Sequence, residues 1–348
     1  MLQFADNLTD LSRKLDSVLR DSSSIFLLTD ENVSEKCLPQ LIAACPFLEK
    51  AEVIEIESGE SSKSVEIVLH LWQHLLDCNA DRKSVLINLG GGVVTDLGGF
   101  IASTFKRGIR TIHIPTSLLG MVDAAIGAKT GIDFGGIKNA IGTFYPADVL
   151  VYPQFAQSLP EQEVTSGFGE VLKTALITDA EFSAQLMKIK KIAIGDLMEF
   201  IPTCAFIKEE IVSEDLQESG RRKLLNLGHT IGHALESSWL ESGNHKPHGI
   251  CIALGILAET RIAAQKNLCD GSLVDELDEF VIRVFGLQNT VLPDIRSIQK
   301  TIHQDKKNRA GTILMVLLNR LGLASIDIPA DFSEIELAWS DLQKRLNG

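Results

Sequence analysis

The chain has 348 residues, 45% of them hydrophobic and 23% charged, with a formal net charge of −13 at pH 7. This length exceeds what one hydrophobic core usually serves, so we expect two globular domains. The negative charge repels nucleic-acid phosphates and acidic membrane surfaces, which excludes both as favourable partners. The start of the chain has the character of neither a signal nor a transit peptide, no apolar run is long enough to span a membrane, and the six scattered cysteines form no CxxC pair. We therefore predict a cytoplasmic protein with free thiols and no membrane span.

The first half of the chain alternates short β-rich runs with helical patterns. Residues 1–20 carry leucine and valine at helical spacing. The β-rich runs that follow are Ile25–Leu28, Ala51–Ile56, Val85–Leu89, Thr111–Ile114 and Val149–Val151. Helical stretches such as Val65–Leu76 separate them. This alternation predicts a parallel α/β sheet that ends near Tyr152.

The second half is predicted to be mainly helical. Long segments with 3.6-residue periodicity follow one another, namely Glu163–Leu176, Phe182–Ile194, Leu197–Ser213 and Leu224–Ser238. One predicted strand pair, Thr312–Leu318 and Leu323–Ile328, interrupts the helices. We place the seam near Ser158–Pro160, where a proline followed by Glu161 resembles a helix start. A ligand is expected in the cleft between the two halves.

A glycine turn follows one of the predicted strands. The apolar run Lys83–Leu89 leads into Gly90–Asp96, with the sequence GGGVVTD, and a helical stretch follows. Strand, glycine turn and helix together let backbone amides approach a pyrophosphate. The turn is not a strict GxGxxG motif, because Thr95 stands where the last glycine would be. Taken alone, it is equally compatible with nucleotide binding and with a plain tight turn.

Histidines and one carboxylate form a candidate metal site. His229 and His233 are four residues apart and share one face of a helix. Two imidazoles leave an ion short of ligands, so others must come from elsewhere. His245 and His248, in a loop before a helix, are candidates, and so is Glu170, whose charge on an apolar helix needs a partner. The alternative is that these are surface and loop histidines without a metal.

Basic residues recur where the chain is otherwise apolar or rich in glycine, at Arg107, Lys129, Lys138, Lys173, Lys208, Arg222, Lys306 and Lys307. In an acidic protein this placement favours an anionic substrate, although each residue alone could be a solvated side chain. Asp123 also lies in an apolar run and needs a partner, for which Lys129 is a candidate.

Taken together, these segments resemble the 3-dehydroquinate synthase family from about Ser58 to Gly322. The strongest motifs are GGGVVTDLGGF, KRG, IPTSLLGMVDAAIGAKTGID and KNAIGTFYP, supported by GFGEVLKTALI, RRKLLNLGHTIGHALE, HGICIALGI and DKKNRAG. The resemblance implies an α/β Rossmann-like NAD-binding domain over residues 1–158. It also implies an all-α, mainly helical domain over residues 159–348 for metal and substrate. The family is homodimeric, with the active site between the two domains.

The resemblance also assigns the metal ligands. It implies that Glu170, His229 and His248 hold zinc or cobalt, with His245 as the runner-up for the third place. His233 then lies outside the ligand set, near the substrate phosphate, where an imidazole is suited to proton transfer.

The same resemblance assigns residues that bind NAD and residues that bind the substrate. NAD contacts are expected from Gly59, Glu60, Lys63, Gly91, Gly92, Val93, Asp96, Thr116, Ser117, Lys129, Lys138, Phe155 and Ser158. The substrate carboxylate is assigned to Lys208 and Arg222, and the phosphate to Lys129, Asn139, Lys306 and Arg107, the last from the neighbouring subunit. Asp123, Lys173 and Asn226 would position the hydroxyls, so the expected catalytic residues are Asp123, Lys129, Lys173, Lys208, Asn226 and His233.

The implied activity is that of a phosphate-eliminating carbon–oxygen lyase of the shikimate pathway. 3-Deoxy-D-arabino-heptulosonate 7-phosphate would be oxidised at C5 by NAD, lose phosphate, be reduced again and close to 3-dehydroquinate by an aldol step. Two alternatives are another sugar phosphate cyclase and a metal-dependent polyol dehydrogenase of the same fold. The carboxylate clamp favours the dehydroquinate branch, because neutral sugars would not need it.

Overall fold

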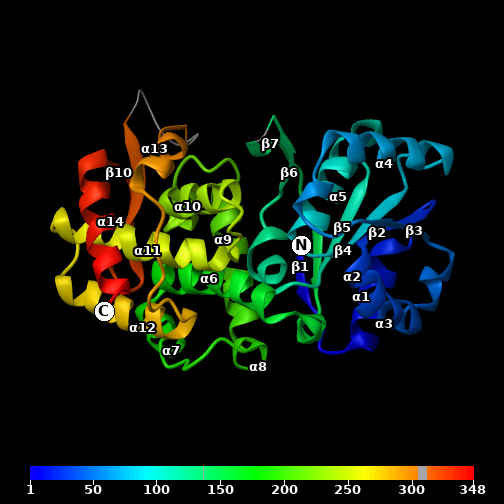
Figure 1. Cartoon of the computed structure of the whole chain (residues 1–348). Helices are drawn as coiled ribbons and strands as arrows, with labels where there is room; N and C mark the ends of the chain where they lie inside the picture. The colour runs from blue at the N-terminus through cyan, green and yellow to red at the C-terminus, as the bar shows by residue number, and fades with distance from the viewer. Residues whose placement is uncertain (136, 305–311) are drawn as a thin grey trace. The chain divides into compact units, whose positions relative to one another are not determined.

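The computed structural model describes residues 1–135, 137–304 and 312–348. The chain divides into two compact units (Figure 1). Unit 1 comprises Met1–Pro160 and Ile201–Leu216, and unit 2 comprises Glu161–Phe200 and Gln217–Gly348. In the part of the chain described, no helix is both long enough and apolar enough to cross a membrane.

Unit 1 is built on a six-stranded sheet with the order β1-β8-β5-β4-β2-β3, in which neighbouring strands are parallel. The strands are β1 (Leu2–Phe4), β2 (Ile25–Asp30), β3 (Glu52–Ile56), β4 (Val85–Gly90), β5 (Arg110–Pro115) and β8 (Asp148–Val151). The strands predicted from the β-rich runs are therefore confirmed. The helical spacing found in the first 20 residues is confirmed as α1 (Leu8–Leu19). β1 was not predicted, and it forms because Leu2, Gln3 and Phe4 pair with the edge of β8.

Helices cover both faces of this sheet, and Figure 1 shows α4 and α5 on one face and α1 to α3 on the other. They are α1 (Leu8–Leu19), α2 (Glu31–Lys36), α3 (Leu38–Ala44), α4 (Val65–Asp77) and α5 (Gly92–Thr104), joined by most of α9 (Phe200–Glu214). Leu71 of α4, Leu86 of β4 and Ile101 of α5 belong to one buried apolar cluster. An antiparallel hairpin of β6 (Lys129–Phe134) and β7 (Ile137–Phe144) completes the unit.

Unit 2 is mainly helical, as predicted. Its helices are α6 (Glu161–Thr178), α7 (Ala180–Leu186), α8 (Ile194–Leu197), α10 (His229–Glu241), α11 (His248–Gln265), α12 (Gly271–Phe285), α13 (Ile295–Gln304) and α14 (Phe332–Leu346). The predicted strand pair is confirmed as β9 (Ile313–Arg320) and β10 (Leu323–Ala330), which run antiparallel.

Three predicted helices of this half have different bounds. The helix expected over 182–194 begins at Ala180 and ends at Leu186, and the one expected over 197–213 is split between α8 and α9. The helix expected over 224–238 begins only at His229. A 3₁₀ turn over 221–226 precedes it, and Gly228, at φ 78°, turns the chain into the new helix axis.

Glycines allow three helices of unit 2 to approach backbone to backbone. α11 packs against both α6 and α10. A side chain at Gly249 of α11 would overlap the backbone of α6 near Gly169, and one at Gly169 would overlap Gly249. A side chain at Gly255 would overlap the carbonyl group of Gly228, which directly precedes α10. No other residue type fits at these crossings, so the glycines set the spacing of the three helices.

We therefore predict that Gly255→Ala destabilises the protein by roughly 3 kcal/mol, because the added methyl group must push α10 away from α11. Thermal unfolding would show this as a midpoint about 6–12 °C lower, at 2–4 °C per kcal/mol. Gly271→Ala is the matched control, since that helical glycine has open space around it. Equal midpoints for the two variants would contradict the packing argument.

Candidate functional site

Glu170, His229 and His248 meet in unit 2, each at or next to a glycine crossing. Glu170 lies on α6, His229 is the first residue of α10, and His248 is the first residue of α11. One oxygen of Glu170, Oε1, lies 3.3 Å from Nε2 of His229 and 3.1 Å from Nε2 of His248. The Glu170 side chain is only 1% exposed, and its other oxygen pairs with the Lys173 ammonium group. The structure thus brings the three predicted metal ligands together.

Acceptors around the two imidazoles fix which nitrogen faces the carboxylate. Nδ1 of His229 lies 3.0 Å from the carbonyl oxygen of Leu227, and Nδ1 of His248 lies 3.1 Å from Oε2 of Glu236. Each Nδ1 therefore carries a proton and donates it, which leaves Nε2 as the lone-pair nitrogen of a neutral ring. Two such lone pairs cannot face one carboxylate oxygen at these distances. Either a proton on each Nε2 or a cation among the three groups is required.

The pKa shifts in this cluster also indicate that it needs a positive charge. Burial alone would raise the pKa of Glu170, but Lys173 and His229 outweigh burial and hold that pKa well below its usual range. Burial alone would lower the pKa of His248, but its hydrogen bonds with Glu170 and Glu236 outweigh burial and raise the pKa to about 10. Without a metal, protons on the imidazoles supply the positive charge. A divalent cation would replace them.

The donor set and its spacing fit zinc or cobalt. Tetrahedral coordination at zinc-to-nitrogen and zinc-to-oxygen distances of about 2.0–2.2 Å places neighbouring ligand atoms roughly 3.3–3.5 Å apart. The measured separations of 3.3 and 3.1 Å are close to this range. His233 is more exposed, and its ligand nitrogen lies within 4.8 Å of those of His229 and His248. His245 is exposed in the loop before α11.

Glu259 holds the start of α10 and was missed in the sequence. This α11 carboxylate is fully buried and accepts hydrogen bonds from the backbone N–H groups of Gly228, at 2.6 Å, and Ile231, at 3.2 Å. No side-chain hydrogen bond from the N-cap residue itself caps α10. Glu259 therefore caps the helix whose first residue is His229. Its signal was the one used for Glu170, a carboxylate within an apolar helical run.

The glycine turn of unit 1 leads from β4 into α5 as predicted. Gly91 is the N-cap of α5 and has no side-chain cap, so the first backbone amides of the helix remain available to an anion. A Cβ atom added at Gly91 would lie 3.2 Å from Oγ of Ser117, and one added at Gly92 would lie 3.2 Å from Cβ of Ala124. Both contacts are tight, so the turn favours glycine at these two positions. Thr116 and Ser117 are buried after β5, beside this turn.

The ammonium group of Lys63 contacts other residues of unit 1 that were predicted to bind NAD. Its ammonium group, on a side chain only 3% exposed, lies 2.9 Å from Oδ2 of Asp96 and 3.4 Å from Oε1 of Glu60. It also donates a 2.6 Å hydrogen bond to Oδ1 of Asn139, a residue that the sequence assigned to the substrate phosphate. Gly59, at φ 105°, begins the short turn that positions Lys63.

One partner of Asp123 is Lys208, whose ammonium group lies 2.6 Å from both Oδ1 and the backbone carbonyl of Asp123. Lys129, the partner expected from the sequence, is exposed at the start of β6. In unit 2, Arg222 is buried on the 3₁₀ turn that precedes α10, and the amide of Asn226 contacts the Glu218 carboxylate.

The remaining predicted residues lie on several elements. Arg107 is exposed in a tight turn after α5, where Lys106, Arg107 and Gly108 all have positive φ values of 48°, 71° and 113°. Val93 lies in the first turn of α5, Lys138 is exposed in β7, Phe155 is buried, and Ser158 ends a 3₁₀ turn. Lys306 and Lys307 lie outside the described residues.

Two family models match the chain in succession, the 3-dehydroquinate synthase N-terminal model over residues 53–166 and the C-terminal model over residues 167–308. A 3-dehydroquinate synthase of Parabacteroides distasonis is 38% identical over 304 residues, which cover 86% of this chain and 85% of that protein. One of Latilactobacillus sakei subsp. sakei is 41% identical over 277 residues, 79% of this chain and 76% of that protein.

A solved structure of ValA, the 2-epi-5-epi-valiolone synthase of Streptomyces hygroscopicus subsp. jinggangensis with NAD⁺ and Zn²⁺ bound, has a TM-score of 0.84 at 25% identity. The likeness covers 99% of this chain and 97% of that one. The two family models and these relatives together identify a sugar phosphate cyclase. Within that class, the chain belongs to the 3-dehydroquinate synthase family.

We predict that zinc binding at pH 7–8 releases at least one proton. The pKa of His248 is raised to about 10, so its imidazole is protonated at this pH and must lose a proton to bind the ion. Apparent zinc affinity should therefore rise with pH up to about 10. Calorimetry in buffers of different ionisation enthalpy measures the released protons. A binding enthalpy that is the same in all buffers would contradict the assignment.

We further predict that Glu259→Gln weakens zinc binding roughly tenfold or more, as loss of a positioning group typically does. A neutral amide can accept from only one of the two N–H groups at the start of α10, so His229 loses its fixed position. The exposed Glu241→Gln, at the other end of α10, is the matched control. Equal zinc affinity in both variants would show that the cap does not position the ligand.

Proposed function

We propose that the chain is a 3-dehydroquinate synthase that converts 3-deoxy-D-arabino-heptulosonate 7-phosphate to 3-dehydroquinate and phosphate. The relatives that match over most of their length carry this name. The observation that carries the proposal is the buried Glu170 carboxylate, which faces Nε2 of His229 and of His248 while both Nδ1 atoms are occupied. That arrangement suits a divalent ion, which the reaction requires.

Glu170, His229 and His248 would hold zinc or cobalt, which acts as a Lewis acid toward the substrate hydroxyl when bound. Leu227 and Glu236 keep the two rings turned toward the ion through their Nδ1 atoms. His233, close to both ligands but more exposed, can exchange protons with the substrate side. Lys173 holds the second Glu170 oxygen and presents a cation beside the site.

We assign NAD to residues 1–158, and metal and substrate mainly to residues 159–348. When bound there, NAD would supply reversible hydride chemistry within one turnover. The uncapped start of α5 would take the pyrophosphate, with Thr116 and Ser117 beside it. Lys63 and Asp96 would fix the surrounding loop through their ion pair.

The anionic groups of the substrate would be held by the basic residues. We assign the carboxylate to Lys208 and Arg222, two buried cations of a kind that binds carboxylates. The phosphate is assigned to Lys129, Asn139, Lys306 and Arg107. Asp123, Lys173 and Asn226 would position the hydroxyls.

Assembly and location are further parts of this proposal. Arg107 is exposed on a turn of three consecutive positive φ values, a conformation that costs free energy and is typical of functional positions. We propose that this turn reaches the site of a second copy in a homodimer. We also propose a cytoplasmic location, in keeping with the acidic composition and scattered free thiols.

The test is an assay with 3-deoxy-D-arabino-heptulosonate 7-phosphate, in which phosphate and NADH are followed together. We expect phosphate release without net NADH, and loss of activity with a chelator that zinc or cobalt reverses. Stoichiometric NADH would favour a polyol dehydrogenase instead, and an absence of phosphate release would contradict the proposal.

The metal ligands are tested by His229→Ala, which we expect to lose both the bound ion and turnover. His245→Ala is the matched control, because His245 is exposed in the adjacent loop. It should keep both. A variant at His229 that retained metal and rate would remove this residue from the site.

A further inference from the structure

A second group of potential metal ligands lies in unit 1, at the edge of the sheet. Nε2 of His74 is 3.1 Å from Oε1 of Glu52 and 3.7 Å from Sγ of Cys78. The three ligand atoms all lie within 4.8 Å of one another. We infer that Glu52, His74 and Cys78 form a site for a thiophilic divalent cation of the zinc class, separate from the cluster in unit 2.

Rigid elements hold these ligands in place. His74 and Cys78 are one helical turn apart on α4, and the backbone N–H of Cys78 donates to the carbonyl group of His74, which ends the helix. Leu71 and Leu75 anchor the helix in the core. Glu52 begins β3, the outermost strand of the sheet, and its backbone is in register with Phe26 of β2. The three side chains therefore converge without any rearrangement of the backbone.

The separations, which are also those of ordinary hydrogen bonds, fit the ligand spacing of a bound ion. Tetrahedral zinc with one sulfur, one nitrogen and one oxygen ligand places neighbouring ligand atoms roughly 3.4–3.5 Å apart. The two measured separations lie on either side of this value. A thiolate and an imidazole select zinc, cobalt or cadmium over magnesium and calcium, which prefer oxygen ligands. Binding exchanges the Cys78 thiol proton for the ion, which then carries a Cys–His–Glu set with one open position.

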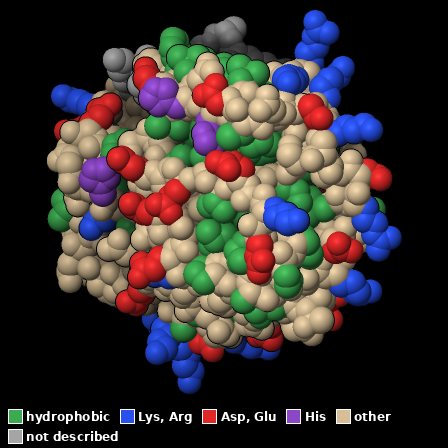
Figure 2. All heavy atoms as spheres, turned by 90° about the vertical axis from the view of Figure 1, so that its right-hand side faces the viewer, with side chains coloured by type: hydrophobic (Ala, Val, Ile, Leu, Met, Phe, Trp, Pro, Cys, Tyr) green, Lys and Arg blue, Asp and Glu red, His purple; other side chains and the backbone are tan. Residues whose placement is uncertain are grey.

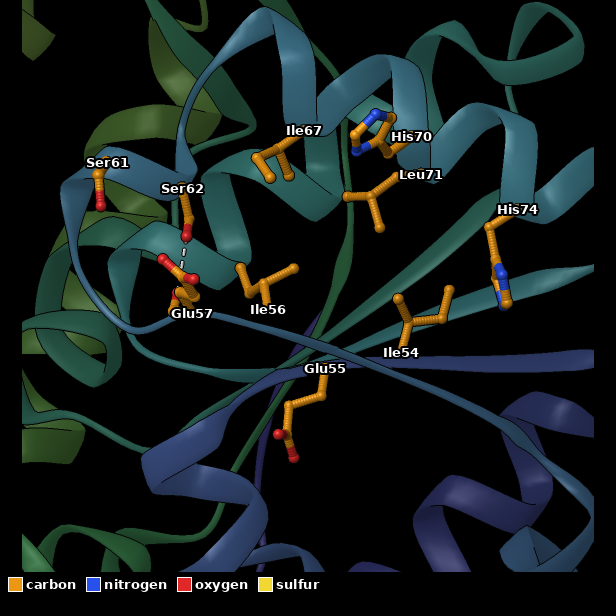
Figure 3. A pocket seen from close by; sticks show the side chains of 10 residues that line it. All are labelled: Ile54, Glu55, Ile56, Glu57, Ser61, Ser62, Ile67, His70, Leu71 and His74. Atoms are coloured by element: carbon orange, nitrogen blue, oxygen red, sulfur yellow. Dashed lines mark hydrogen bonds between the residues drawn. The ribbon is translucent and has the colours of Figure 1, made fainter.

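The surroundings also suit a cation with an open coordination position. His74 borders an open pocket of about 480 Å³ that Ile54 and His70 also line, and Figure 3 shows His74 at one end of it. Glu57 lines the same pocket, whereas Figure 3 shows the side chain of Glu55 pointing away from His70 and His74. Figure 2 shows a face on which histidine side chains lie among acidic ones. Water or a small ligand in the pocket can occupy the fourth position.

The ion would join the start of β3 to the end of α4. The intervening segment contains the Gly59–Lys63 turn, so the ion would close a loop around a part of the chain assigned to NAD. Closing a loop restricts the unfolded chain and stabilises the folded one. The inferred role is therefore structural, and turnover at the unit 2 site does not depend on it.

Cobalt titration of the metal-stripped protein tests this site. A thiolate ligand gives an intense sulfur-to-cobalt charge-transfer band in the near ultraviolet, and the unit 2 ligands contain no cysteine. We expect this band in the wild-type protein and in His229→Ala, and its loss in Cys78→Ser together with one of two zinc equivalents. His70→Asn, one turn earlier on α4, is the matched control and should keep the band.

A second measurement needs no variant. Zinc should protect Cys78 from alkylation by iodoacetamide, as read from peptide mass spectra, while cysteines elsewhere change little. The inference is overturned if the band is absent, if it persists in Cys78→Ser, or if zinc leaves alkylation of Cys78 unchanged. Because His229→Ala keeps this site, a failure of the proposed function and a failure of this inference give different results.

Discussion

The close approach of three helices around glycines is the constraint on which the rest of this structure depends. Gly169 and Gly249 bring α6 against α11, while Gly228 and Gly255 bring α10 against α11. Each proposed ligand is the sequence neighbour of a crossing glycine, so Glu170, His229 and His248 share one point because the backbones do. In each of the motifs GFGE, LGH and HG, a glycine that permits close helix packing therefore stands directly beside a proposed metal ligand.

The same packing creates the electrostatic problem that a metal ion solves. It buries a carboxylate beside two imidazoles whose Nδ1 atoms are already occupied by Leu227 and Glu236. A buried carboxylate without cations nearby would be costly, and a neutral ring would direct its lone pair at an oxygen. In the absence of an ion, hydrogen bonds with Glu170 and Glu236 outweigh burial and raise the pKa of His248 to about 10, so a proton occupies the ring. The site is therefore preorganised for a cation and binds protons only until one arrives.

Sequence patterns predicted the sheet strands and the helical second half and named candidate ligands, because periodicity, turn glycines and a charge in an apolar helix are local signals. The choice of Glu170, His229 and His248 among those candidates came from the family resemblance. They missed what tertiary contacts decide. β1 is a strand because β8 offers it an edge, and α10 begins at His229 because Gly228 crosses α11. Lys208 as a partner of Asp123, and Glu259 as the cap of α10, join residues 85 and 28–31 positions apart, which no local pattern connects.

Anomalous diffraction at the zinc absorption edge, from crystals of the zinc-loaded protein, tests the central claim most directly. The account predicts a peak in unit 2 at about 2.0–2.2 Å from a Glu170 oxygen and from Nε2 of both His229 and His248. Zinc-loaded crystals with no peak among these three side chains, or with the unit 2 ion held by other residues, would contradict it.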